Sequence, residues 1–221
     1  MRFRSVAPRY THIYWWWLTS FVIIPPADIA YSETLGEMFL NMIKMKKEII
    51  FFDGDGTLWY PKSTRYTEKP HWIYLKSKDA HDHYKHLVMI PTVLSTLKKL
   101  KRMDVITILL STHPHPPEEA DSIINHKATH FRLNDLFDEI HATREFHGSK
   151  GEFIVKILKE RGIPKTRALM VGDHYRWDYK SAKDVGVDAL LIESEYMQKE
   201  IQGRRIKKTI KKLSDIFNYA F

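Results

Sequence analysis

The sequence contains no cysteine among its 221 residues. Disulfide bonds, thiolate metal sites and cysteine nucleophiles are therefore excluded, and the chain is compatible with a reducing compartment. Internal repeats and low-complexity tracts are also absent. What is present is an ordinary balance of 43% hydrophobic and 28% charged residues, in a length that suits one α/β domain. We expect a globular, cytoplasmic protein.

Apolar runs long enough for a membrane span are lacking as well. A span would need about 20 apolar residues, and the one candidate lies in residues 1–44. It is broken by Thr19, Ser20, Pro25 and Pro26. A secretory signal is a second interpretation, which Asp28 fits poorly. We favour a third, in which translation starts at Met42 or Met45, and we assign residues 1–44 to an extension outside the domain.

Positive charge dominates both ends of the chain, in residues 1–9 and 199–212, within a formal net charge of +8. A nucleic-acid or anionic-membrane surface is one interpretation. We favour the exposed face of a C-terminal helix, because the apolar residues have helical spacing and aromatic residues do not alternate with the lysines. The buried stripe of that helix would be Ile201, Ile206, Ile210, Leu213 and Phe217. We therefore expect neither nucleic acid nor membrane as a partner.

Two aspartates lie directly behind an apolar run that is typical of a buried parallel strand. Residues 49–52 are Ile-Ile-Phe-Phe, and Asp53, Gly54, Asp55 and Gly56 follow. At the carboxyl end of a strand, where open α/β sheets bind their ligands, Asp53 and Asp55 would point to the same side. The two glycines permit a sharp turn whose N–H groups can bind a phosphate. The pattern predicts phosphoryl transfer, with one carboxylate as nucleophile and the other as proton donor.

Further polar residues follow in an order that strengthens this prediction. They are Ser111 and Thr112 after the apolar run 105–110, Lys150 at the start of an amphipathic segment, and Asp173 after the run 167–172, with Asp178 five residues later. Taken singly, Ser111 or Asp173 could be a helix N-cap and Lys150 an exposed lysine. Together they place polar side chains at the ends of several strands, which favours a catalytic site.

This order of features resembles the haloacid dehalogenase superfamily of phosphohydrolases. Four details are similar to its magnesium-dependent phosphatase family: Asp-x-Asp-x-Thr-Leu-Trp at 53–59, a helix led by Pro91, Gly-Ser-Lys at 148–150 and Gly-Ile-Pro at 162–164. The resemblance covers about residues 47–192. The chain departs from that family after Asp173, where a second strand-end Asp and a nearby Asn are usual. Here Gly172 precedes Asp173 and Asp178 follows, a spacing found elsewhere in the superfamily.

The resemblance implies a magnesium-dependent phosphatase that hydrolyses phosphate monoesters through an aspartyl-phosphate intermediate. Asp53 would attack phosphorus. Asp55 would protonate the leaving oxygen and then activate the water that hydrolyses the intermediate. Lys150 would pair with the phosphate and screen Asp53 from Asp173.

The same resemblance assigns a metal site and a phosphate site. Mg²⁺ would bind the side chains of Asp53 and Asp173 and the carbonyl group of Asp55. Asp178 would support the site by holding Lys150 or a metal-bound water. The phosphate would contact Gly54, Ser111, Thr112 and Lys150.

Alternating strand and helix patterns predict a doubly wound, mostly parallel α/β sheet with a Rossmann-like core. Strands are predicted at 47–53, 104–110, 138–142, 167–172 and 187–192. Helices are predicted at 91–102, 117–126, 150–161, 177–185 and 195–218. We expect one domain over residues 45–221, with residues 59–87 as a small flap over the site and no large cap domain.

The flap is rich in aromatic and histidine residues. Its aromatic side chains would contact the substrate, and they are Trp59, Tyr60, Tyr66, Trp72 and Tyr74. The flap histidines favour surface loops over a zinc site, because lysines lie among them and neither a helix nor a strand fixes their directions.

The substrate would be a small phosphorylated compound or a phosphoprotein, of the phosphotyrosine-like or phosphosugar type. Two alternatives stay open at this point. One is phosphoryl transfer to an acceptor other than water. The other is a non-catalytic module on the same fold that binds nucleic acid through its basic tail, against which the intact Asp53 and Asp55 argue.

Overall fold

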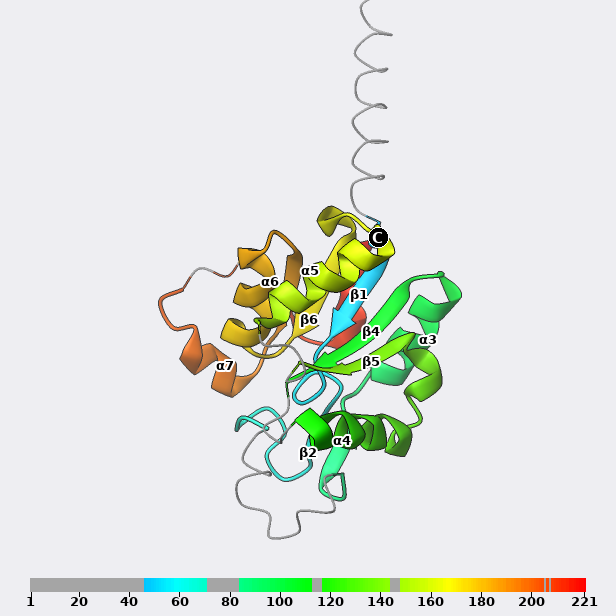
Figure 1. The fold of residues 1–221 in the computed structure, drawn as a ribbon. Helices are drawn as coiled ribbons and strands as arrows, with labels where there is room; N and C mark the ends of the chain where they lie inside the picture. The colour runs from blue at the N-terminus through cyan, green and yellow to red at the C-terminus, as the bar shows by residue number, and fades with distance from the viewer. Residues whose placement is uncertain (1–45, 71–83, 113–116, 144–147, 205, 207) are drawn as a thin grey trace, which may run out of the picture. The chain divides into compact units, whose positions relative to one another are not determined.

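The computed structural model describes residues 46–70, 84–112, 117–143, 148–204, 206 and 208–221, drawn in colour in Figure 1. All of them belong to one unit, residues 42–221. The interpretations of residues 1–44, of Trp72 and Tyr74, and of the histidines between 71 and 83 fall outside the described residues. Within the described ranges, none of the helices combines the length and the apolar character that crossing a membrane requires.

Six parallel strands form the central sheet, in the order β5-β4-β1-β6-β7-β8 (Figure 1). They are β1 (Ile49–Phe52), β4 (Ile106–Ser111), β5 (Glu139–Ala142), β6 (Ala168–Gly172), β7 (Asp188–Ile192) and β8 (Thr209–Ile210). The chain starts in the middle of the sheet at β1, builds outward to β5 and then continues on the other side of β1 from β6. This is a doubly wound sheet, so the predicted fold class is confirmed.

Helices cover both faces of the sheet, and this explains why β1 is apolar at every position. The helices are α3 (Val93–Arg102), α4 (Pro117–His130), α5 (Lys150–Arg161) and α6 (Ser181–Asp184). Ile50 and Phe52 pack in the core that includes α3 and α4. Ile49 and Phe51 pack in the opposite core, which includes residues of α5 and α6. Successive side chains of a strand point to opposite faces, so a strand between two helical layers is buried along its whole length.

The start of α5 is fixed by local hydrogen bonds, and this start determines where Lys150 lies. The Ser149 side chain accepts from the N–H of Glu152, and the Glu152 carboxylate accepts from the N–H of Ser149 at 2.6 Å. This reciprocal capping box satisfies two backbone donors that a helix start leaves free. Lys150 is consequently the first residue of the helix, at the carboxyl edge of the sheet.

The base of the predicted flap is a two-stranded antiparallel sheet of β2 (Trp59–Pro61) and β3 (Leu87–Met89). The described part of the flap outside these strands comprises residues 62–70 and 84–86. Trp59 is fully buried, and its ring stacks on that of Phe131 with 5.7 Å between centroids. The expectation that Trp59 offers its ring to the substrate is therefore wrong. The side chain belongs to the core beneath the flap.

The C-terminal segment does not form the single helix predicted at 195–218. A short helix, α7 (Glu195–Glu200), is followed by Gly203 with a left-handed φ of 77°, by strand β8, and by two short helical turns, Leu213–Ile216 and α8 (Phe217–Ala220). The β8 strand pairs with β7 at the edge of the sheet, and this pairing is a contact that local helical spacing does not reveal. The predicted stripe is therefore not one helix face, although Ile210 and Leu213 are buried.

Three other short helical turns complete the described elements. They are Asn134–Leu136, Lys165–Arg167 and the π-helical turn Tyr175–Lys180. The π-helical turn lies directly behind β6 and carries Asp178, whereas the sequence pattern predicts an α-helix from residue 177 to residue 185.

Candidate active site

Asp53 is the first residue beyond β1, and the sheet itself fixes its position. Its N–H donates to the carbonyl oxygen of Val171 at 2.9 Å, which extends the pairing of β1 with β6 by one residue. The chain then turns through Gly54 and Gly56, and Gly56 has a left-handed φ of 82°. A Cβ atom on Gly56 would lie 2.2 Å from an oxygen of Asp173, so this turn packs directly against the end of β6.

Lys150 joins two of the carboxylates. Its Nζ donates to Oδ1 of Asp53 at 2.8 Å and to Oδ1 of Asp178 at 2.5 Å, and all three side chains are buried. Asp178 also accepts from the N–H of His174 at 3.0 Å. The structure thus brings Lys150, Asp53 and Asp178 together across 28 to 97 residues of sequence, with Lys150 between the predicted nucleophile and the predicted supporting residue.

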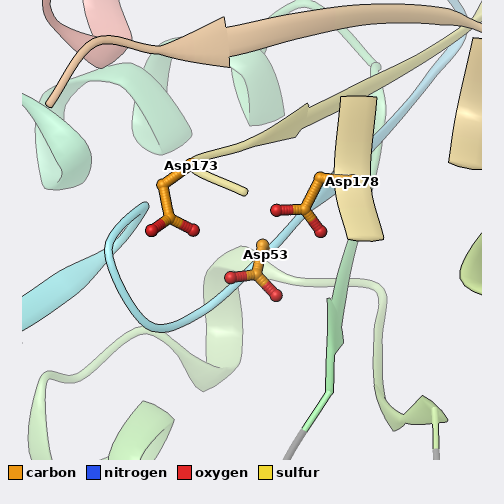
Figure 2. A group of neighbouring side chains, drawn as sticks. All are labelled: Asp53, Asp173 and Asp178. Carbon is orange, nitrogen blue, oxygen red and sulfur yellow. The ribbon is translucent and has the colours of Figure 1, made fainter. Parts of the chain in front are cut away.

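Three buried carboxyl groups, those of Asp53, Asp173 and Asp178, each offer an oxygen within 4.8 Å of the others (Figure 2). They come from the end of β1, the end of β6 and the π-helical turn behind β6. Tyr196, in the first turn of α7, donates its hydroxyl group to Oδ2 of Asp173. The expected metal ligands Asp53 and Asp173 therefore lie side by side, and Asp178 lies with them.

The electrostatics of this group are unfavourable to three ionised carboxylates. Burial raises the pKa of Asp53 from 3.8 to about 7 although Lys150 opposes the shift, and the charge of Asp178 adds to it. Burial and the charge of Asp53 likewise raise the pKa of Asp173 well above its ordinary value. Burial by itself lowers the pKa of Lys150, but the neighbouring Asp178 and Asp53 carboxylates outweigh burial and raise it overall.

Asp55 faces a different set of partners. Lys127 on α4 is fully buried, and its Nζ lies 3.1 Å from both carboxylate oxygens of Asp55. The indole N–H of Trp59 donates to Oδ1 of Asp55 at 2.8 Å. Burial lowers the pKa of Lys127, and the Asp55 carboxylate counteracts this effect. The predicted proton donor is therefore held by a lysine and a tryptophan.

Sequence analysis missed Lys127 and Tyr196, although each carries a weak signal. Lys127 occupies the buried stripe of α4, three residues after Ile124 and seven residues after Ala120, which is the spacing of one helix face. The predicted helix ended at residue 126, which left Lys127 outside it. Tyr196 follows the carboxyl end of β7 by four residues, which places it at the same edge of the sheet as Asp53. A charged residue in an apolar stripe and a polar residue just behind a strand both warrant inspection.

The residues expected to bind phosphate lie at this edge too. Ser111 is the buried last residue of β4, and a Cβ atom built on Gly54 would lie 3.0 Å from its Oγ. The glycine at position 54 is therefore what lets the turn approach Ser111 closely. Thr112 is exposed, and its hydroxyl group lies 2.8 Å from that of Thr143 behind β5.

The donor set fits a hard divalent cation. Four buried carboxylates, those of Asp53, Asp55, Asp173 and Asp178, face two buried ammonium groups, those of Lys127 and Lys150. The site consequently carries an excess of two negative charges when all six groups are ionised. Carboxylate oxygens are the ligands that Mg²⁺ prefers, and a divalent cation among Asp53, Asp173 and Asp178 would balance the excess.

Comparison with known proteins gives a family and a fold. The sequence profile of the haloacid dehalogenase-like hydrolases matches residues 47–192. No curated protein matches the sequence significantly. Among solved structures, a haloacid dehalogenase-like family hydrolase from Streptococcus pneumoniae is 18% identical, with a TM-score of 0.58 over 78% of this chain and 98% of its own.

Two other solved structures show the same arrangement. A predicted phosphoglycolate phosphatase from Haemophilus somnus is 15% identical and covers 78% of this chain and 97% of its own, with a TM-score of 0.58. A phosphatase from Thermococcus onnurineus is 19% identical and covers 79% of this chain and 97% of its own, with a TM-score of 0.53. At these identities the similarity concerns the fold of the sheet and its helices.

Proposed function

Because the chain belongs to the haloacid dehalogenase-like hydrolase family, we propose that it is a magnesium-dependent phosphatase that hydrolyses phosphate monoesters through an aspartyl-phosphate on Asp53. One observation carries the proposal. Asp53 is buried at the end of the central strand, where Lys150 binds it, the Asp55 turn follows it and the carboxylates of Asp173 and Asp178 face it. Phosphoryl transfer needs a positioned nucleophile, a proton donor and positive charge, and this edge offers residues for each.

In the first step, a carboxylate oxygen of Asp53 attacks phosphorus from the side opposite the ester oxygen. The new O–P bond forms as the bond to the leaving oxygen breaks, and Asp55 transfers a proton to that oxygen, so an alcohol is released. The Lys150 ammonium lies 2.8 Å from Asp53, which places positive charge beside the phosphoryl group during the transfer.

In the second step, water attacks the phosphorus atom of the aspartyl-phosphate. Asp55, now ionised, accepts a proton from that water, the Asp53–phosphorus bond breaks, and inorganic phosphate leaves. The two steps return both aspartates to their starting states. One residue therefore acts first as acid and then as base, which requires its carboxyl group to stay in a fixed position.

Magnesium supplies the positive charge that lets a dianionic phosphate approach a carboxylate-rich site. The side chains of Asp53, Asp173 and Asp178 would hold it, together with the backbone carbonyl of Asp55 that the family resemblance assigns. Tyr196 orients Asp173 by donating to Oδ2. Lys150 keeps Asp178 in place, because its Nζ donates to Oδ1 of Asp178 at 2.5 Å.

We propose small phosphorylated metabolites as the first substrates to test, with phosphotyrosine-like and phosphosugar compounds ahead of others, and a cytoplasmic setting for the reaction. One structural relative is described as a predicted phosphoglycolate phosphatase, which adds short phosphorylated acids to the test. Because the Trp59 ring is buried, substrate choice would depend on other parts of the flap. Ser111 and Gly54 would contact the phosphate itself.

A screen tests the reaction type and the substrate class together. Phosphorylated metabolites and phosphopeptides are incubated with the protein and Mg²⁺, with chelator or with Ca²⁺, and released phosphate is measured. We expect release that depends on Mg²⁺ and that Ca²⁺ inhibits. The Asp53→Asn protein is the matched control for contaminating phosphatases. Phosphate release at equal rates by the parent chain and by the Asp53→Asn protein would overturn the proposal.

A further inference from the structure

Lys127 is one of the most completely buried side chains of the described protein, and a buried lysine needs a reason. It lies on α4 within an apolar stripe that includes Ala120, Ile124 and Ala128, where a leucine would pack without any cost of desolvation. Its ammonium contacts both oxygens of Asp55 at 3.1 Å. The partner is thus the residue that the proposed mechanism uses as acid and base.

We propose that Lys127 is the positioning residue of Asp55: its ammonium, aided by the indole N–H of Trp59, holds the Asp55 carboxyl group beside α4 and away from the other buried carboxylates. The catalytic consequence of this proposal rests on the proposed phosphatase activity. The contact between Lys127 and Asp55 rests on the distances alone.

The position of Asp55 relative to the other acids supports this role. Among the described residues, the group of carboxylates within 4.8 Å of one another consists of Asp53, Asp173 and Asp178, and the Asp55 side chain is not in it. Asp55 is nevertheless only two residues from Asp53 and close enough to raise its pKa. A carboxyl group this near to a cation site would be a competing ligand unless other groups held it elsewhere.

The two donors also fix the direction in which Asp55 points. Lys127 binds both oxygens, and Trp59 binds Oδ1 at 2.8 Å. Trp59 itself cannot swing, because it is fully buried and stacks on Phe131 with an angle of 14° between the rings. Phe131 follows the last turn of α4, so one helix supplies the lysine and supports the tryptophan. A general acid works only from a defined position, and these contacts supply one.

The prediction concerns the leaving group. If Lys127 acts through Asp55, its loss should matter most when the leaving oxygen needs a proton. We expect Lys127→Met to reduce kcat on an alkyl phosphate at least about 10-fold more than on p-nitrophenyl phosphate, since general acid catalysis supplies about 100- to 10,000-fold. KM for the aryl substrate should change little, because Lys150 and Ser111 are intact.

A double-mutant cycle separates positioning from general damage. Lys127→Met, Asp55→Asn and the double variant are compared in kcat on the alkyl phosphate. Because Lys127 acts through Asp55, we expect Lys127→Met to cost less than about 3-fold in the Asp55→Asn background. The same cycle in urea unfolding measures the contact without any activity, so it stays informative even if no substrate is turned over.

Lys47 provides the matched control. It is also a buried lysine bound to an aspartate, at 2.7 Å from Asp188, but it lies at the amino edge of the sheet. Lys47→Met should lower stability and leave the ratio of alkyl to aryl rates unchanged. Should Lys127→Met not fold, two other variants undergo the same comparison. Lys127→Gln keeps a donor and loses the charge, and Trp59→Phe removes the other donor.

Each result has a definite meaning. A selective loss on alkyl phosphates that disappears in the Asp55→Asn background supports the positioning role. Equal losses on both substrates, or an undiminished loss in the Asp55→Asn background, overturn it even if the phosphatase is active. An absence of turnover by the parent chain overturns the proposed function instead, and in that case additive unfolding free energies for Lys127→Met and Asp55→Asn overturn the contact as well.

Discussion

Two groups of paired lysine and aspartate side chains lie at opposite edges of the same sheet, and the pKa values of their aspartates are shifted in opposite directions. At the amino edge, Lys47 precedes β1, and its Nζ donates at 2.7 Å to Oδ2 of Asp188, the first residue of β7, and at 2.7 Å to the carbonyl oxygen of Thr166. At the carboxyl edge, Lys150 binds Asp53 and Asp178. Both lysines are therefore fully paired.

The aspartates show the difference. Burial alone would raise the pKa of Asp188, but the hydrogen bond and the charge of Lys47 lower it to about 2. Burial raises the pKa of Asp53 to about 7 in spite of Lys150. Asp188 is partly exposed and has two further lysines nearby, Lys183 and Lys208. At the amino edge, three lysines lie near the one carboxylate of Asp188. At the carboxyl edge, four buried carboxylates share two buried lysines.

This contrast indicates what each edge is for. Ion pairs that lower a carboxyl pKa stabilise the folded chain, whereas buried carboxylates with raised pKa values destabilise it at neutral pH. Such destabilisation persists where function requires it, and perturbed pKa values collect at active sites. The amino edge is accordingly structural, and the carboxyl edge has the unbalanced negative charge that the proposed cation and phosphate site would require.

The largest expected effect is on turnover when the nucleophile is removed. Asp53→Asn keeps the size of the side chain and removes the attacking oxygen, so we expect kcat to fall by at least about 10,000-fold. The fold should persist, and the metal-free variant should be more stable than the parent at pH 8, because one buried charge is gone. Phosphate release and urea unfolding measure the two effects. Near-parental activity would refute the role of Asp53.

The next effect concerns proton donation. Asp55→Asn should slow alkyl phosphates by about 100- to 10,000-fold and p-nitrophenyl phosphate much less, because nitrophenolate leaves without a proton. Rates on a series of aryl phosphates whose leaving groups differ in pKa provide the measurement. A dependence on leaving-group pKa that is unchanged from the parent chain would count against Asp55 as the acid.

The sheet was largely predictable from local patterns, and the C-terminal part was not. Strands buried on both faces must be apolar, so residues 49–52 and 168–172 stand out in the sequence. The segment 195–218 has apolar residues at helical spacing, but its strand β8 forms because β7 offers an edge to pair with. Tertiary pairing of this kind overrides local spacing.

The candidate site was likewise predictable only in part. Asp53 and Asp173 directly follow strands and Lys150 opens a helix, so their motif predicts a common edge. Lys127 reaches Asp55 across 72 residues, and Tyr196 reaches Asp173 across 23 residues from an element whose length was mispredicted. The sequence marks Lys127 and Tyr196 only weakly, and no local pattern identifies their partners, because these contacts depend on how a helix is packed against a distant turn. Their discovery required the fold.

A third prediction concerns stability and pH at the carboxyl edge. Burial raises the pKa of Asp53 from 3.8 to about 7, so the folded chain holds a proton that the unfolded chain releases. The resulting stabilisation is complete below about pH 4 and is lost as the pH rises to 7, by an amount on the order of a few kcal/mol. Urea unfolding in chelator, from pH 4 to pH 8, measures this loss.

The control is Asp53→Asn, which should decline less over the same range. Mg²⁺ should raise the melting temperature of the parent chain more at pH 7.5 than at pH 5, because it binds the ionised carboxylates of the folded state. Equal shifts at both pH values would argue against a cation site built from these groups.

A fourth prediction removes the amino-edge lysine. Lys47→Met leaves Asp188 with its more distant lysines and leaves the carbonyl oxygen of Thr166 without this donor. We expect the unfolding free energy to drop by about 2 kcal/mol, which is below the value for a wholly buried pair because Asp188 is partly exposed. Turnover should stay within about 2-fold of the parent at a temperature where both proteins are folded. A large loss of kcat would contradict the distinction between a structural amino edge and a catalytic carboxyl edge.

The smallest effect is expected at Asp188 itself, and its pH dependence should be opposite to that of Asp53. Because the pKa of Asp188 is lowered from 3.8 to about 2, its contribution is present above about pH 4 and disappears as the pH falls through 2. Solvent screens this partly exposed group, so Asp188→Asn should cost about 1 kcal/mol at pH 7. The unfolding free energy of the parent minus that of Asp188→Asn, measured by urea unfolding from pH 2 to pH 7, should increase with pH, whereas the parent value minus that of Asp53→Asn should decrease with pH. If both differences moved in the same direction with pH, the two edges would not be electrostatic opposites, and the carboxyl edge would need no cation to balance it.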